Sequence, residues 1–122
     1  MCKDTVRSSP ALIREIFVCV QTFHHTTKDA HGDCQLDNII LYANPVTGVD
    51  EVRLIDLPCH DERSISKDIL RISSQIYLNR GLRENETLLR LVAEYQAADC
   101  SQEAVLRIVD YLEGVHLREN VT

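Results

Sequence analysis

The sequence predicts an α+β domain that is mainly helical and carries one short β-hairpin. Three observations indicate this class. A helix-start signal with an amphipathic stripe opens the chain, two short apolar runs flank a turn in its middle, and apolar residues recur at helical spacing through its second half. With 122 residues, of which 44% are hydrophobic, the chain has the size of one domain and can bury a small core. We therefore expect a single domain over residues 1–122.

The first helix is expected to begin at Pro10. Ser9 can act as its N-cap, and proline suits the first helical position because the N–H that it lacks would have no intrahelical partner there. The helix is expected to end in a solvated terminus at His24 and His25, where the helix dipole favours positive charge. A polar loop should follow over residues 29–37. The apolar stripe of this helix is formed by Ile13, Ile16, Phe17 and Val20.

A β-hairpin is expected in the middle of the chain. Residues 39–42 read IILY, a short β-branched apolar run, and residues 44–48 read NPVTG, which is typical of a turn. A second apolar run ends with Leu54 and Ile55, directly before Asp56. Two short strands joined by such a turn are expected to pair as an antiparallel hairpin.

Three helices are expected in the remainder of the chain. Gly81 lies where the C-terminal cap of the first of them belongs, and Asn85 can act as the N-cap of the second. Ser101 can act as the N-cap of the third, which Gly114 would end. The apolar stripes of the three helices are, in order, Ile65–Ile69–Ile72–Ile76, Leu88–Leu89–Val92–Tyr95 and Val105–Ile108–Val109–Leu112.

Composition and charge disfavour several function classes. The net charge of −6 argues against a nucleic-acid binder that is held by phosphate contacts. The five cysteines show no CxxC or Cys/His spacing of a structural zinc site, and their spread is typical of a reduced chain. The first residues do not resemble a signal peptide, and no apolar run approaches the length of a membrane span. We therefore expect a cytoplasmic domain that binds neither nucleic acid nor membrane.

Polar side chains cluster between the first helix and the end of the hairpin. His31, Gly32 and Asp33 open a loop that leads through Asn38 into the first strand, and Asp56 follows the second. Because a hairpin brings the ends of its strands together, Asp33, Asn38 and Asp56 are expected to converge. Their carboxylate and amide oxygens suit Mg²⁺. Phosphoryl transfer needs such a metal and a separate carboxylate that orients the attacking hydroxyl.

These motifs resemble the aminoglycoside and choline phosphotransferase branch of the kinase superfamily. That branch carries an HGDxxxxN loop and then a strand of the form hydrophobic-Ile-Asp, and the chain has HGDCQLDN and RLID. Within the branch, residues 31–76 look closest to the kinase-like, ternary-complex-associated domains of bacterial signalling and conflict proteins. The resemblance covers residues 9–78 and implies a kinase-like C-terminal lobe. The catalytic loop and hairpin would span 31–57, and the helical remainder 64–114.

The resemblance also implies a role for each motif residue. Asp33 would be the catalytic base that orients the substrate hydroxyl, and His31 would brace the loop around it. Asn38 and Asp56 would bind Mg²⁺ and, through the metal, ATP. Asp68 would be a structural acceptor that steadies the loop backbone. The implied reaction moves the γ-phosphate of ATP to a hydroxyl acceptor, for which a small molecule is favoured over a protein.

Several features depart from the family pattern. Cys34 and Gln35 replace the residues common after the HGD motif, so the substrate side of the loop is expected to differ. Leu57-Pro58 follows the metal-binding aspartate where kinases often have Phe-Gly. Neither a Gly-rich phosphate loop nor a strand-borne lysine paired with a helix glutamate precedes His31. The N-terminal nucleotide lobe is therefore expected to be absent, and the isolated chain inactive.

Two alternatives to an active phosphotransferase stay open. In the first, the chain is a pseudokinase-like interaction or scaffold module in a signalling assembly. Self-association or a partner chain would then cover the apolar face left by the missing lobe. In the second, the chain is a truncated fragment without independent function. Retention of Asp33, Asn38 and Asp56 favours catalysis, whereas the missing nucleotide lobe favours the alternatives.

Overall fold

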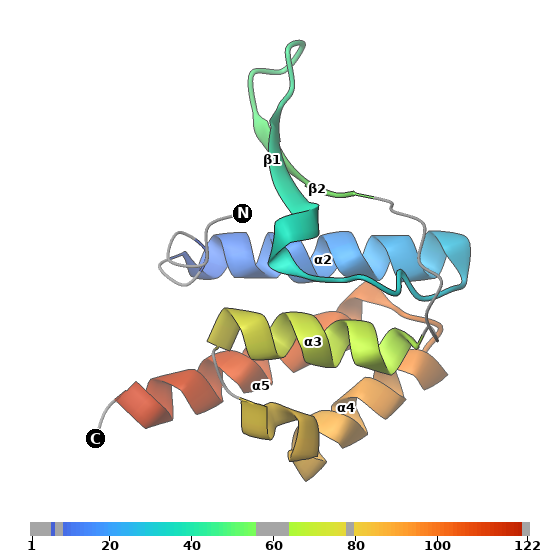
Figure 1. Cartoon of the computed structure of the whole chain (residues 1–122), viewed down its shortest axis with the longest axis vertical. Helices are drawn as coiled ribbons and strands as arrows, with labels where there is room; N and C mark the ends of the chain where they lie inside the picture. The colour runs from blue at the N-terminus through green and yellow to red at the C-terminus, as the bar shows by residue number, and fades with distance from the viewer. Residues whose placement is uncertain (1–5, 7–8, 56–63, 78–79, 121–122) are drawn as a thin grey trace.

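The computed structural model of the chain describes residues 6, 9–55, 64–77 and 80–120 (Figure 1). In these residues α-helices predominate, and the one sheet has two antiparallel strands, which confirms the predicted α+β class. The expected metal ligand Asp56 lies outside the described residues, as does the Leu57-Pro58 pair. No helix in the described part of the chain combines the length and the apolar character that a membrane crossing requires.

Helix α2 (Pro10–Thr27) begins where the sequence predicts. The side-chain oxygen of Ser9 accepts a hydrogen bond from the Leu12 amide at 3.3 Å, so Ser9 is the N-cap. The helix ends at Lys28, which has φ 58° and donates its amide hydrogen to the carbonyl oxygen of His24. That carbonyl is one of those left without an intrahelical partner at a helix end.

The predicted hairpin is present as strands β1 (Ile39–Ala43) and β2 (Asp50–Leu54). The strands pair antiparallel, with Ile39 opposite Leu54 and Ala43 opposite Asp50. Only the first residue of β1 is buried and the other four are exposed. The hairpin therefore projects from the helical body, as Figure 1 shows.

The remaining helices are α3 (Ile65–Tyr77), α4 (Glu86–Ala97) and α5 (Gln102–Asn120), with a short 3₁₀ helix η2 (Arg80–Glu84) before α4. The predicted N-caps are confirmed, since Asn85 accepts from the Leu88 amide at 2.9 Å and Ser101 from the Ala104 amide at 3.2 Å.

Three of the expectations for these helices were wrong. Gly81 lies inside η2 and caps no helix, and Gly114 lies inside α5, which continues to Asn120. A glycine inside a helix costs only about 1 kcal/mol relative to alanine, so packing elsewhere can carry the helix through it. Leu89 is 40% exposed, because the face of α4 that is buried is narrower than the apolar stripe in the sequence.

Helix α2 lies at the centre of the arrangement. It contacts α5 and α3 on one side and strand β2 on the other (Figure 1). Its apolar stripe is therefore buried on the side that faces the other helices, where the core forms. The largest fully buried side chains are Ile16, Phe17, Leu36, Ile39, Ile69, Ile72, Ile76, Leu82, Leu88, Tyr95, Ile108 and Leu112.

Substitution by alanine is expected to change the free energy of unfolding in opposite directions at Gly114 and Gly48. A Cβ added at Gly114 or at Gly48 meets no atom within 4 Å, so neither alanine would clash. Gly114 is helical, and Gly114→Ala should raise the free energy of unfolding by about 0.5–1 kcal/mol. Gly48 has φ +71°, and Gly48→Ala should lower it by about 1–2 kcal/mol. Urea denaturation measures both, and a change of the same sign in both variants would contradict these backbone assignments.

Candidate active site

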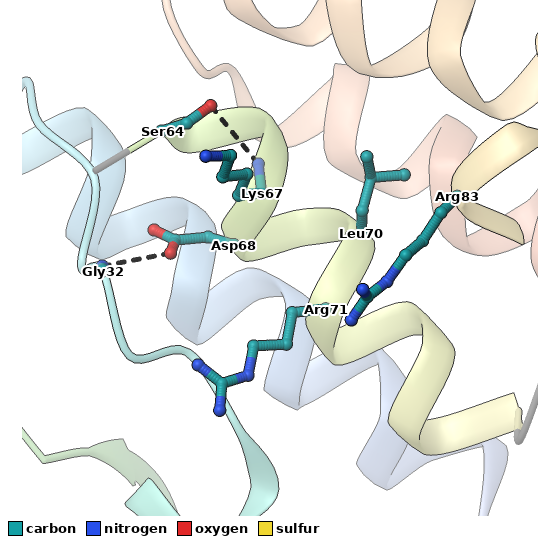
Figure 2. A pocket seen from close by; sticks show the side chains of 7 residues that line it. All are labelled: Gly32, Ser64, Lys67, Asp68, Leu70, Arg71 and Arg83. Carbon is teal, nitrogen blue, oxygen red and sulfur yellow. Dashed lines mark hydrogen bonds between the residues drawn. The ribbon is translucent and has the colours of Figure 1, made fainter. Parts of the chain in front are cut away.

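The carboxylate of Asp68 holds the loop that leads to the hairpin. Asp68 lies in the first turn of α3 and is 3% exposed. Its Oδ1 accepts from the Gly32 amide at 3.1 Å (Figure 2), and its Oδ2 accepts from the His31 amide at 2.6 Å. Gly32 has φ 91°, which a residue with a side chain rarely adopts, so glycine lets both amides point at one carboxylate. This is the geometry that a structural acceptor needs.

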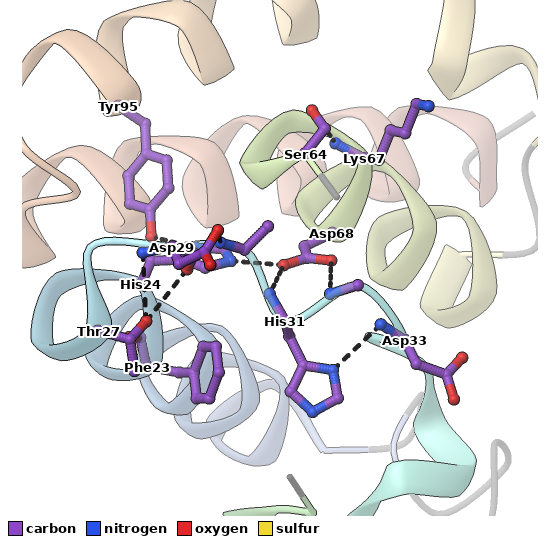
Figure 3. Close-up of polar contacts among 12 residues, drawn as sticks. Phe23, His24, Thr27, Asp29, His31, Asp33, Ser64, Lys67, Asp68 and Tyr95 are labelled. Atoms are coloured by element: carbon purple, nitrogen blue, oxygen red, sulfur yellow. Dashed lines mark hydrogen bonds and ion pairs between the residues drawn. The ribbon is translucent and has the colours of Figure 1, made fainter. Parts of the chain in front are cut away.

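A buried histidine completes the contacts of Asp68. His24 is fully buried, and its Nε2 lies 2.8 Å from Asp68 Oδ2 (Figure 3). Because a carboxylate only accepts hydrogen bonds, Nε2 is the donating nitrogen. The Nδ1 atom of His24 lies 2.8 Å from the hydroxyl of Tyr95 on α4. The expected solvated terminus at His24 was therefore wrong, since this buried side chain joins α2 to α3 and α4.

His31 connects the same loop to the end of the hairpin. It is 1% exposed, and its ring meets Phe23 edge-on with centroids 5.1 Å apart. Its Nε2 lies 2.6 Å from the carbonyl oxygen of Ile55, and its Nδ1 accepts from the Asp33 amide at 3.2 Å. Nδ1 is thus an acceptor and Nε2 a donor. The two bonds fix the backbone at Asp33 and tie it to the residue that precedes Asp56.

Asp33 and Asn38 face each other across the loop. The side-chain nitrogen of Asn38 donates to Asp33 Oδ2 at 2.9 Å and to the Asp33 carbonyl oxygen at 2.8 Å. The other carboxylate oxygen, Oδ1, accepts from Arg71 Nη1 on α3 and from the Gln35 side chain, both at 3.1 Å. Asp33 and Arg71 keep 32% and 40% of their side-chain surface exposed. The carboxylate is therefore oriented from three directions and still reaches the surface.

The two residues that depart from the family pattern take different places. Cys34 is fully buried, and burial raises the pKa of its thiol well above the usual range, so it stays protonated inside the core. Gln35 bonds Asp33 and also accepts from Arg71 Nη2 at 3.2 Å. Of the two departures, Gln35 is therefore the one that alters the surroundings of the Asp33 carboxylate.

The oxygen atoms near Asn38 are of the kind that binds a magnesium ion. Both of its side-chain bonds to Asp33 use Nδ2, so the oxygen Oδ1 is the atom that these bonds leave for a metal. The Ile55 amide donates to the Asn38 carbonyl at 2.7 Å, which brings the chain past Asn38 immediately before Asp56. In the described ranges no group of three His, Cys, Asp or Glu residues could hold a metal. A magnesium site would thus need Asn38 Oδ1 and the carboxylate of Asp56.

Sequence reasoning missed three residues of this site. Arg71 gave no signal, because a lone arginine on a helix is usually solvated. Tyr95 was assigned to the core stripe, which is its place, but its hydroxyl also bonds His24. One signal for His24 was available in the sequence. It lies seven residues before the HGD motif and four after Val20, so it continues the apolar stripe of α2.

Comparisons of the chain with family models, with curated proteins and with solved structures found no match. The kinase resemblance therefore depends on the motif residues themselves. What these residues can do chemically follows from their geometry, and the function that fits this geometry best is a proposal.

The buried carboxylate of Asp68 predicts a large effect of a small change. In Asp68→Asn an amide nitrogen replaces one acceptor oxygen, so at least one of the three donors at His24, His31 and Gly32 loses its partner. A buried donor without a partner costs about 1–3 kcal/mol, and we expect a loss of about 2–4 kcal/mol in the free energy of unfolding. Urea denaturation measures it. Asp37→Asn, at an exposed position in the same loop, is the matched control and should change stability by less than about 0.5 kcal/mol. Equal effects in the two variants would contradict the structural role of Asp68.

Proposed function

We propose that the chain is the C-terminal lobe of a kinase-like phosphotransferase, which moves the γ-phosphate of ATP to a hydroxyl group. The sequence contains no Gly-rich phosphate loop, so the proposal requires that a nucleotide-binding lobe complete the site. One observation carries the proposal. Asp33 and Asn38 form a hydrogen-bonded pair in a loop that two buried side chains, His31 and Asp68, hold against the end of the hairpin.

Asp33 is the proposed base. A carboxylate offers about four lone-pair sites, and three of them accept from Asn38, Gln35 and Arg71. Two of these bonds go to Oδ1 and one to Oδ2, so Oδ2 retains the capacity to accept the proton of a substrate hydroxyl. The partial exposure of Asp33 supports this role, because a substrate must reach the carboxylate.

Mg²⁺ is the proposed metal, held by Asn38 Oδ1 and Asp56. When bound, it would neutralise charge on the phosphates of ATP. The chain's own contribution is to hold the donor atoms in place before the metal arrives. The Asn38 amide is oriented by its two bonds to Asp33, and the backbone of the hairpin is fixed by the bonds that Ile55 makes to Asn38 and His31.

A second candidate function is a non-catalytic interaction module, and the hairpin favours it. Both strands project from the helical body (Figure 1), and large apolar side chains lie exposed on β1 and on the turn. Exposed apolar side chains on one projection are typical of a surface that another molecule covers. The exposed residues are Ile40, Leu41, Tyr42, Val46 and Val49.

A nucleotide site that the chain holds without the completing lobe predicts a thermal shift that needs both Mg²⁺ and ATP. Binding at about a hundredfold excess over Kd stabilises the folded state by about 2.7 kcal/mol, which raises Tm by several degrees. The shift should vanish in Asp56→Asn, which removes a proposed metal ligand. It should persist in Asp33→Asn, because the base does not bind the metal and the backbone carbonyl at position 33 still holds the Asn38 amide, and in the control Asp37→Asn. If none of the three additions (Mg²⁺, ATP, or both) changes Tm relative to the ligand-free chain, the chain alone holds no nucleotide site.

The interaction module predicts self-association through the hairpin. Sedimentation of the purified chain should then give a dimer mass, and Leu41→Glu should convert it to a monomer by placing a charge in the contact. Leu89→Glu, at an exposed leucine on α4, should leave the dimer intact. A monomer at about 100 μM wild-type chain would contradict self-association, since stable interfaces have Kd values well below that concentration.

A further inference from the structure

A pocket of about 500 Å³ opens beside the HGD loop (Figure 2). One wall is the backbone at Gly32, and the others come from the first turns of α3 and from η2. Leu70 supplies an apolar part of the wall. Because Gly32 directly precedes Asp33, the pocket adjoins the proposed catalytic carboxylate. The polar residues that line the pocket are Ser64, Lys67, Asp68, Arg71 and Arg83.

The exposed charge of the pocket is positive. Lys67 and Arg83 are exposed, and Arg71 is 40% exposed. Among the described residues of the lining the one acid is Asp68, which is 3% exposed, and its oxygens accept from three donors of the loop and of α2. Three accessible cations therefore share one concavity in a chain whose net charge is −6. A concave site lined by one sign of charge concentrates ligands of the opposite sign.

The position of the cations sets this pocket apart from a solvated basic surface. Lys67 and Arg71 lie four residues apart on α3, so both lie on the same face of the helix. Arg83 lines the same pocket from η2 (Figure 2). The N-terminal end of α3 adds the positive end of a helix dipole, with Ser64 at its entrance. The described lining therefore offers an anion basic side chains and a helix end within one concavity.

We propose that this pocket binds the phosphate group of a small phosphorylated compound. Lys67 and Arg83 would contact the phosphate, and their two charges match those of a phosphate monoester near neutral pH. Arg71 is held by Asp33 and Gln35, so it contributes its charge from the side of the HGD loop. The size of the pocket suits a ligand of metabolite size.

The proposal also names the substrate class of the proposed phosphotransferase, and this second part rests on that proposed function. The acceptor would be a phosphorylated compound with a free hydroxyl, held by its phosphate so that the hydroxyl points toward Asp33. In the transfer, the hydroxyl oxygen bonds to the γ-phosphorus of ATP. The bond from that phosphorus to the bridging oxygen breaks, ADP leaves, and the hydroxyl proton passes to Asp33 Oδ2.

Calorimetric titration in EDTA, without Mg²⁺ or ATP, tests the pocket. The probes are inorganic phosphate, glycerol 3-phosphate, glycerol, ethanolamine and the tricarboxylate tricarballylate. We expect both phosphate probes to bind, and glycerol and ethanolamine not to bind. Lys67→Ala and Arg83→Ala should each weaken phosphate binding about tenfold, equivalent to about 1.4 kcal/mol. Arg90→Ala removes a cation from an exposed position on α4 outside the pocket, and is the matched control.

Three outcomes would overturn the proposal. The first is no heat of binding from either phosphate probe at millimolar concentration. The second is that Arg90→Ala weakens phosphate binding as much as Lys67→Ala and Arg83→Ala do. Binding would then depend on the net charge of the chain and not on the pocket. The third is binding of tricarballylate in preference to phosphate, which would refute the ligand class. Phosphate binding in EDTA with no Mg²⁺-ATP shift would leave the anion pocket standing and show that the chain alone holds no nucleotide site, so the pocket and the nucleotide site are tested separately.

Discussion

The site depends on one buried carboxylate, that of Asp68. The loop between α2 and η1 (Leu36–Asn38) has no regular structure of its own, so its backbone amides need partners from elsewhere. Asp68 supplies them from α3 at His31 and Gly32, and binds His24 of α2 through the same carboxylate. These contacts span 36 to 44 residues of sequence. A charge buried this deeply is stable only when its hydrogen bonds are made, so the packing of two helices and the path of the loop are fixed together.

By fixing the loop backbone, Asp68 also helps to fix the positions of the candidate catalytic groups. The His31 backbone is held by Asp68, and its ring bonds both the Asp33 amide and the Ile55 carbonyl. Because both bonds come from one rigid ring, the backbone at Asp33 and the end of β2 keep a fixed relation. Asn38 and Arg71 then orient the carboxylate itself. Positioning of this kind is what phosphoryl transfer demands of a protein, because the metal and the nucleotide carry most of the charge rearrangement.

Local signals in the sequence predicted most of the fold, and the failures have physical causes. The caps at Ser9 and Asn85 were predictable because they are made within three residues of the chain. The end of α5 was not, because a glycine inside a helix costs only about 1 kcal/mol and so does not by itself end the helix at Gly114. The motif residues Asp33 and Asn38 were found from their spacing, whereas His24 and Arg71 enter the site through contacts made by folding. The contacts of Arg71 leave no pattern in a single sequence, whereas the place of His24 on the apolar stripe of α2 is a sequence signal for its burial but not for its partners.

Arg71 connects the two parts of the site. Its guanidinium bonds Asp33 and Gln35 while it lines the pocket next to Gly32, so one cation faces both the proposed base and the proposed phosphate position. An anion in the pocket would draw on the same positive charge that holds the Asp33 carboxylate. The two interactions are therefore coupled, and coupling between binding events is reciprocal. Any change in Asp33 that strengthens its hold on Arg71 would weaken the attraction of the pocket for an anion. The ion pair between α3 and the loop would thus link binding of an anion in the pocket to the charge of the proposed base, without any movement of the helices.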